Sequence, residues 1–209
     1  TPVSSTTNSS SVSFDKTAPT LSSVSILSNN PDTAKAKPGD TITVSFSSSE
    51  NIQTPTVTIA GHSASVSGAN SSWSATYQMQ SGDTEGTVSF SISFSDLASN
   101  AGTPVSSTTN ASSVSFDKTA PTTTPSLLGG LYNSTQSVTL SSNETASIHY
   151  TTDGSAPTTS STLYSGPILI SNDTILKFFA VDTTGNTESI HTESYTFDTV
   201  LPTLSSVSI

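Results

Sequence analysis

Two sets of oxygen-bearing side chains recur along the sequence in the same order, and carboxylates arranged in this way could bind a cation. The sets are Asp15, Glu50, Asp96 and Asn100, and then Asp117, Glu144, Asp182 and Asn186. Carboxylates that lie close together repel one another unless a cation or protons intervene. Oxygen ligands on flexible loops, with no histidine or cysteine nearby, favour Ca²⁺ over zinc or copper. The sequence therefore predicts a Ca²⁺ ion in each set.

The same residues also fit a purely structural role. An aspartate in a linker can cap a turn, and an Asp-x-x-x-Asn loop can be a tight turn whose asparagine adopts the left-handed conformation. Both alternatives require the fold to bring a linker and two loops of one domain together.

Other residues with catalytic potential do not form a recognisable site. His62, His149 and His191 are far apart in the sequence and lie in expected strands or hairpins, so we expect strand-face positions and not ligands. Asp153, in Thr-Asp-Gly-Ser, fits the Asp-Gly turn of a hairpin better than a nucleophile. There is no Gly-x-Ser-x-Gly, His-Glu-x-x-His or phosphate-loop motif, and no cysteine. We therefore expect a protein that is not an enzyme.

Charge and hydropathy exclude two classes of partner. The formal net charge is −10, with five lysines and no arginine, so the chain lacks the cations that bind nucleic acid phosphates. No apolar run approaches the roughly 20 residues that a membrane helix needs. We expect no nucleic acid partner and no membrane span in this segment.

Internal repeats divide the sequence into domains. Residues 1–20 and 103–122 differ only at Ser9 and Ala111, and TLSSVSI occurs both at 20–26 and at 203–209. SYTFDTVLPT at 194–203 is a looser copy of SVSFDKTAPT at 11–20. Each copy contains an alternating strand, then a short linker with a proline that ends it, then a new strand. This pattern predicts the end of a preceding repeat at 1–17, domains at 18–117 and 118–198, and the start of a following repeat at 199–209.

Short alternating segments separated by turn residues predict an all-β fold. In the first domain, strands are expected near 20–27, 41–48, 55–60, 62–68, 72–80, 86–95 and 111–117. In the second domain, they are expected near 136–141, 146–152, 162–170, 174–182 and 189–197. Ile42, Val44 and Phe46 should face inward. Such spacing is typical of a β-sandwich, and linkers of about four residues containing a proline predict tandem Ig-like sandwiches in an extended rod.

The order of strands explains why the acidic residues should meet. Strands in a seven-stranded sandwich alternate in direction, so the second-to-third and sixth-to-seventh loops lie beside the incoming linker. In the first domain, these three places carry Asp15, Glu50 and Asp96, and the second domain repeats the arrangement.

Two resemblances support this organisation. PGDTITVSFSSSENI (38–52), VTIAGHSASVSGANSSWSATYQM (57–79), DLASNAG (96–102) and FDKTAPT (116–122) resemble the bacterial Ig-like repeats of large surface proteins. IHYTTDGSAPTTSSTLYSGPILISNDTILKFFAVDTTGNTE (148–188) is similar to the chitobiase/β-hexosaminidase C-terminal type of Ig-like domain. The second resemblance implies an accessory module of the kind found beside glycosidases, proteases and surface repeats, without an active site of its own.

The expected function is that of a stalk, spacer or filament-forming segment of a long extracellular or cell-surface bacterial protein such as an adhesin. Its partners would be neighbouring repeats of the same protein or other copies of it, to which the end strands 1–15 and 201–209 should pair. The alternative is an accessory carbohydrate-binding region of a secreted glycosidase. In that case, polysaccharide would contact aromatic residues such as Tyr132, Tyr164 or Phe178, although core packing is the simpler role for these side chains.

Overall fold

The computed structural model describes residues 14–203, which form strands and no helices. The predicted end strands at 1–15 and 201–209 fall mainly on residues outside this range. Within the range, no helix is long and apolar enough to cross a membrane. Cα positions group the chain into two compact units, Thr1–Asp117 and Lys118–Ile209. The all-β sandwich fold expected from the sequence is confirmed.

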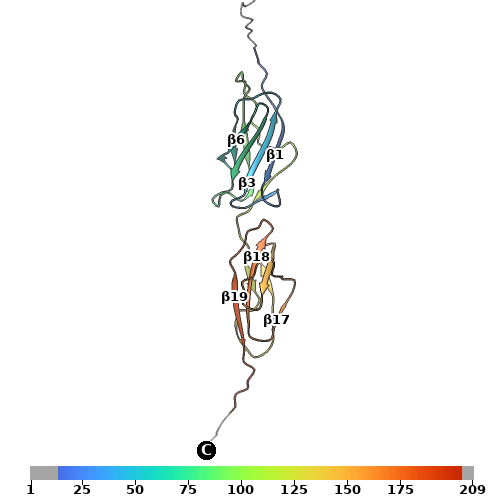
Figure 1. Cartoon of the computed structure of the whole chain (residues 1–209), viewed down its shortest axis with the longest axis vertical. Helices are drawn as coiled ribbons and strands as arrows, with labels where there is room; N and C mark the ends of the chain where they lie inside the picture. The colour runs from blue at the N-terminus through green and yellow to red at the C-terminus, as the bar shows by residue number, and fades with distance from the viewer. Residues whose placement is uncertain (1–13, 204–209) are drawn as a thin grey trace, which may run out of the picture. The chain divides into compact units, whose positions relative to one another are not determined.

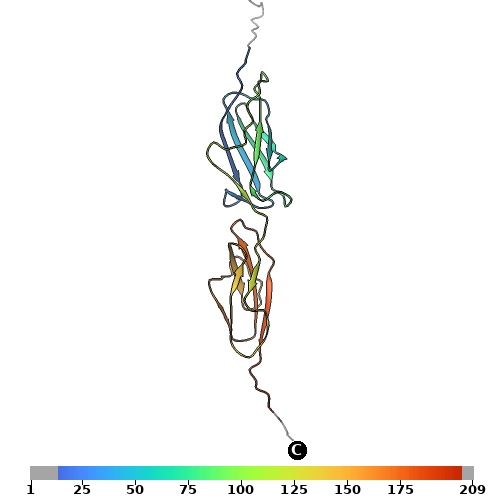
Figure 2. The ribbon, with the colours of Figure 1, turned by 180° about the vertical axis from the view of Figure 1, so that it is seen from behind.

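The described residues of the first unit form ten strands, three of which are labelled in Figure 1. They are β1 (Leu21–Ser28), β2 (Lys35–Ala36), β3 (Thr41–Ser48), β4 (Thr56–Ile59), β5 (His62–Ser63), β6 (Ser65–Ala69), β7 (Ser72–Gln78), β8 (Gly86–Thr87), β9 (Phe90–Ser93) and β10 (Ser115–Phe116). The largest sheet has the order β1-β3-β7-β6, and two smaller sheets have the orders β5-β4-β9 and β2-β10-β8. Figure 2 shows the same unit from behind.

Alternation of apolar and polar residues places the core of the first unit between these sheets. Ile42, Val44 and Phe46 of β3 are buried, as predicted, and so are Ile92 of β9 and Phe116 of β10. Because successive side chains on a strand point to opposite faces, the intervening serines and threonines of β3 form the outer surface.

Some predicted strands are shorter or divided in the structure. The segment 86–95 forms two separate strands, because β8 pairs with β10 whereas β9 pairs with β4. The segment 62–68 is likewise divided between β5, which pairs with β4, and β6, which pairs with β7. Strand partners depend on tertiary contacts, so an apolar alternation cannot indicate where a strand changes sheets.

In the second unit, residues 118–203 form nine strands, arranged mainly in one five-stranded sheet. They are β11 (Thr123–Pro125), β12 (Gly130–Tyr132), β13 (Gln136–Val138), β14 (Leu140–Ser142), β15 (Ala146–Thr151), β16 (Thr162–Leu163), β17 (Ile168–Ile170), β18 (Thr174–Asp182) and β19 (His191–Phe197). The main sheet has the order β12-β19-β18-β15-β16, and β11-β14 and β13-β17 form two-stranded sheets.

The core of the second unit includes an aromatic residue that the sequence analysis offered as a polysaccharide contact, Phe178. Phe178 and Phe179 are adjacent, so their side chains point to opposite faces of β18, yet their exposed fractions are only 0% and 5%. Phe178 packs in the core, and the ring of His149 stacks on Phe179 at a centroid distance of 5.7 Å. Tyr195 is also buried, and its hydroxyl donates to the carbonyl oxygen of Leu127 at 2.6 Å.

Asp153 lies in a turn, as expected, but the turn does not form a two-residue hairpin. Strand β15 ends at Thr151 and its hairpin partner β16 begins only at Thr162. The Asp153 carboxylate accepts hydrogen bonds from the backbone N–H and the hydroxyl of Ser155, which lower its pKa. Gly154 has a φ of +80°, which L side chains rarely adopt.

Candidate cation site at the start of the first unit

The linker that leads into β1 is attached to the first unit by hydrogen bonds. The N–H of Thr20 donates to the Ser49 hydroxyl at 3.0 Å, and the N–H of Ser49 donates to the carbonyl oxygen of Thr20 at 2.8 Å. Earlier in the linker, the Asn100 side-chain amide donates to the carbonyl oxygen of Asp15 at 3.2 Å. These bonds fasten residues 15–20 to the loops that contain Ser49 and Asn100.

Three predicted acidic residues meet where the linker is attached. One carboxylate oxygen each from Asp15, Glu50 and Asp96 lies within 4.8 Å of the other two. Asp15 is exposed, Glu50 is half-buried and Asp96 is buried. Three carboxylate oxygens at such separations could bind a divalent cation from different directions.

Asp96 is held in place by the loop that follows it. The Asn100 backbone N–H donates to Asp96 Oδ1 at 2.8 Å, and the Asn100 side-chain amide donates to Asp96 Oδ2 at 2.7 Å. Burial by itself would raise the pKa of Asp96, but hydrogen bonds from Asn100, Ala98 and Ser99 lower it below its usual value. The carboxylate therefore stays charged, and Asn100 orients it.

Glu50 experiences the repulsion that the sequence predicted. Burial, followed by the negative charges of Asp15 and Asp96, raises its pKa. The folded state therefore binds a proton at Glu50 more tightly than the unfolded chain does. This group favours folding at low pH, and its contribution is lost as the pH rises through its folded pKa. A cation bound beside Glu50 would offset the same repulsion from Asp15 and Asp96.

The second unit repeats the geometry of the linker and the Asp-x-x-x-Asn turn. The N–H of Thr122 donates to Asn143 Oδ1 at 2.7 Å, and the N–H of Asn143 donates to the Thr122 carbonyl oxygen at 3.1 Å. Asp182 Oδ2 accepts a 2.8 Å hydrogen bond from the Asn186 amide. Glu144 and Asp182 have carboxylate oxygens within 4.8 Å of each other.

Asp117, the remaining member of the predicted second set, ends the first unit. Its backbone N–H donates to the carbonyl oxygen of Ala36 at 2.9 Å.

The structural alternative for these residues is right about the turns and wrong about the asparagines. Asp15 Oδ1 does accept a hydrogen bond from the N–H of Thr17, at 2.9 Å. In the two Asp-x-x-x-Asn loops, however, the residue with positive φ is the one before the asparagine, Ser99 at 72° and Gly185 at 93°. The asparagines instead close the turns by donating to the aspartates, and this role is compatible with cation binding by the remaining carboxylate oxygen lone pairs.

Two pairs between a buried carboxylate and a more exposed histidine were not identified from the sequence. His62 Nε2 lies 3.0 Å from Asp83 Oδ1, and His191 Nε2 lies 3.1 Å from Glu188 Oε2. The Tyr77 pKa is raised by burial and by Asp83, so its hydroxyl stays protonated. No motif marks either pair: His62 and Asp83 are 21 residues apart and meet only in the folded chain, whereas His191 and Glu188 are three residues apart at the start of β19. Both histidines also stack on aromatic rings, which indicates a packing role.

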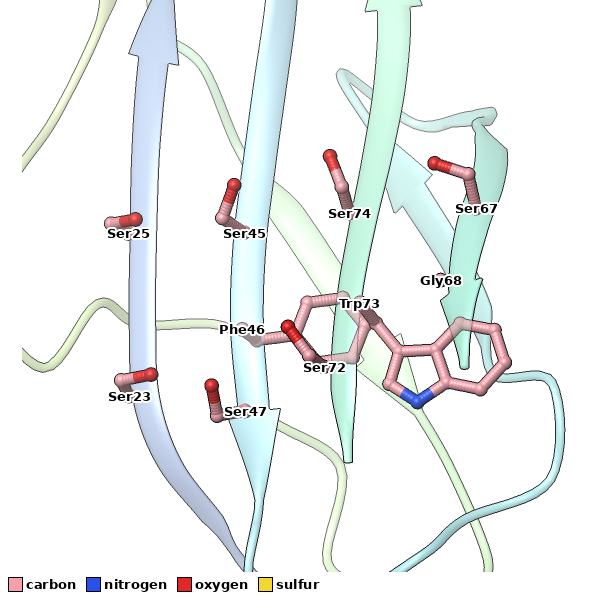
Figure 3. A pocket seen from close by; sticks show the side chains of 10 residues that line it. All are labelled: Ser23, Ser25, Ser45, Phe46, Ser47, Ser67, Gly68, Ser72, Trp73 and Ser74. Carbon is pink, nitrogen blue, oxygen red and sulfur yellow. The ribbon is translucent and has the colours of Figure 1, made fainter. Parts of the chain in front are cut away.

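A shallow depression on the outer face of the β1-β3-β7-β6 sheet is lined mainly by serines (Figure 3). Its volume is about 360 Å³. Strand register places Ser25, Ser45, Ser74 and Ser67 in one row and Ser23, Ser47 and Ser72 in the next. This surface carries hydroxyl groups without charge and can donate to or accept from a neutral, hydroxyl-rich ligand. The side chain of Trp73, which lies beside this depression, is only 8% exposed and therefore offers no open surface on which a sugar ring could stack.

Comparison with known proteins supports an Ig-like module in the second unit. A family model for the chitobiase/beta-hexosaminidase C-terminal domain matches residues 127–192. No curated protein matches the chain. The solved structures of the fibronectin(III)-like modules of Clostridium thermocellum CbhA align with 12% identity and a TM-score of 0.39, over 88% of this chain and 100% of that chain.

Proposed function

We propose that this chain is a non-catalytic structural segment of a long extracellular bacterial surface protein, in which the repeats act as a spacer. The observation that carries this proposal is the attachment of each linker to the unit that follows it. Thr20 and Thr122 are each bound by a reciprocal pair of hydrogen bonds, to Ser49 and Asn143 respectively. A linker bound in this way does not behave as a flexible coil.

The repeated sequence supports the same function. Residues 1–20 and 103–122 differ at a single position, and a spacer tolerates such uniformity because its length matters more than any local site. Strand β1 has eight residues, which extend over about 27 Å at 3.3–3.4 Å per residue. Each added repeat would therefore lengthen the protein by roughly that amount plus its linker.

We further propose that Ca²⁺ strengthens the attachment of the linker to the first unit. Asp15 belongs to the linker, whereas Glu50 and Asp96 belong to loops of the unit. An ion bound to all three carboxylates would connect these segments and relieve the repulsion that raises the pKa of Glu50. By sequence, the same proposal extends to Asp117, Glu144 and Asp182.

Accessory polysaccharide binding is the second candidate function, and two observations favour it. The family matched by residues 127–192 is named after a chitobiase, and the serine-lined face of the first unit is neutral and rich in hydroxyls. The aromatic residues that the sequence suggested as polysaccharide contacts give this function less support. Phe178 is fully buried, and Tyr132 packs against Tyr195 and Phe197 at centroid distances of 6.0 and 6.3 Å.

Sedimentation with insoluble chitin and cellulose separates the two functions. A spacer should remain in the supernatant with both polymers. Retention of the wild-type chain that is lost in Ser45→Glu/Ser74→Glu, but kept in the matched surface variant Ser160→Glu, would favour polysaccharide binding and contradict the spacer. Retention that is lost only in Tyr132→Ala or Tyr164→Ala would contradict the spacer equally and would place the binding surface on the second unit.

A further inference from the structure

Residues 103–117, which end the first unit with the short strand β10, occupy a well-defined slot beside β1. The N–H of Thr109 donates to the Val24 carbonyl oxygen at 2.9 Å, and the N–H of Val24 donates to the Thr109 hydroxyl at 3.0 Å. The N–H of Ile26 donates to the Ser112 hydroxyl at 2.9 Å. Farther along, Val114 and Phe116 are 0% and 1% exposed. Side chains and backbone of 103–117 thus complete the edge of β1 and the core.

The residues that make these contacts have identical counterparts near the N-terminus. Thr109, Ser112, Val114 and Phe116 correspond to Thr7, Ser10, Val12 and Phe14. The single difference in this segment is Ser9 in place of Ala111, and Ala111 is exposed. A residue other than glycine already adopts positive φ at that place, 57°, so serine adds no new backbone constraint. Residues 1–15 can therefore make every contact described for 103–117.

Phe14 and its counterpart Phe116 differ in burial. Phe14 and Phe116 lie in the same sequence, SVSFDKTAPT, but Phe14 is 81% exposed whereas Phe116 is 1% exposed. Burying a phenylalanine side chain contributes roughly 1.5–3 kcal/mol. A second slot of the same kind would therefore favour this segment strongly.

Residues 1–15 cannot reach the slot of their own molecule. Residues 109 and 112 lie beside 24 and 26, so this segment runs in the same direction as β1 and ends where Phe116 pairs with Ala36. In the same slot, residue 15 would lie at that far end. Yet only a few residues connect it to the beginning of β1 at Leu21, a distance of about 27 Å back along the strand. The occupant must come from another molecule.

We propose that the slot of residues 103–117 also accepts residues 1–15 of a second copy of this chain, so that the repeat can exchange its last strand between molecules. The two segments can make equivalent contacts, and the resident segment has the advantage of being tethered. A short tether corresponds to an effective concentration in the millimolar range. At micromolar protein the exchanged state is therefore a minor species, and the experiment must trap it.

Because the sequence contains no cysteine, any disulfide formed in a variant must join the introduced cysteines. Ser115 and Thr87 are paired residues on antiparallel strands, and both are exposed. Cα atoms of such a pair lie about 4.5–5.5 Å apart, which suits a disulfide. Ser13 is the counterpart of Ser115. The full chain carrying Ser13→Cys and Thr87→Cys should therefore form disulfide-linked multimers under mild oxidation, visible on a non-reducing gel.

Two variants control this experiment. Ser115→Cys/Thr87→Cys should form the disulfide within one molecule and verifies the geometry of the pair. Ser5→Cys/Thr87→Cys carries the same number of thiols in the same N-terminal segment, but at a place several residues out of register. Several-fold more multimer from Ser13→Cys/Thr87→Cys than from this variant would support the exchange. Equal amounts from the two variants, or monomer only, would overturn it.

Discussion

Replacing Phe116 by alanine should destabilise the first unit by about 3–5 kcal/mol, the usual cost of deleting a buried phenylalanine side chain. The ring is 1% exposed and belongs to the main core cluster of this unit. Denaturant unfolding followed by the fluorescence of Trp73 reports on this unit alone, because the chain has one tryptophan and it packs in the same cluster.

The sequence provides a matched control for this substitution. Phe14→Ala changes the same residue type within the same ten residues, but the Phe14 side chain is 81% exposed. A surface substitution usually changes stability by no more than about 0.5 kcal/mol. Similar losses from Phe14→Ala and Phe116→Ala would show that the position of Phe116 in the core is wrong.

Asp182→Ala should produce the largest loss of stability among the acidic substitutions in the second unit, about 3 kcal/mol. The carboxylate accepts hydrogen bonds from the backbone N–H groups of Thr184, Gly185 and Asn186, and from the Asn186 side chain. Alanine would leave several of these buried donors without a partner, at about 1–3 kcal/mol for a group that stays unsatisfied. Near-ultraviolet circular dichroism of the tyrosines, four of which lie in this unit, would follow its unfolding.

Asp153→Ala is the appropriate comparison for Asp182→Ala. Asp153 also accepts hydrogen bonds within its own turn, from Ser155, but both groups are exposed, so water can replace the carboxylate. We expect a loss below about 1 kcal/mol. If Asp182→Ala were as mild as Asp153→Ala, the buried turn would not be a major source of stability.

Local patterns in the sequence were sufficient for the parts of the fold that depend on alternation and order. Ile42, Val44 and Phe46 are buried because a strand places every second residue on one face. The meeting of Asp15, Glu50 and Asp96 followed from the order of loops and the alternating direction of strands. Neither inference required knowledge of which strands pair.

Features that depend on contacts between distant segments could not be predicted. Phe179 faces away from the core on a strand, yet the ring of His149 covers it. The pairing of His62 with Asp83 likewise arises only in the folded chain. The same holds for the consecutive strands β8 and β9, which belong to different sheets. The left-handed conformation of Ser99 in place of Asn100 shows that a turn motif identifies a loop better than it identifies the strained residue.

Calcium titration tests most directly our proposal that a divalent cation fastens the incoming linker to the first unit. Calorimetry of the intact chain should give a binding heat. Unfolding monitored at Trp73 should then shift to higher denaturant in Ca²⁺ than in EDTA, by about 2.7 kcal/mol when Ca²⁺ is at one hundred times its dissociation constant. Glu50→Gln, which removes one of the three carboxylates, should lose most of this shift. No heat, together with identical unfolding of the wild-type chain in Ca²⁺ and EDTA, would contradict the claim.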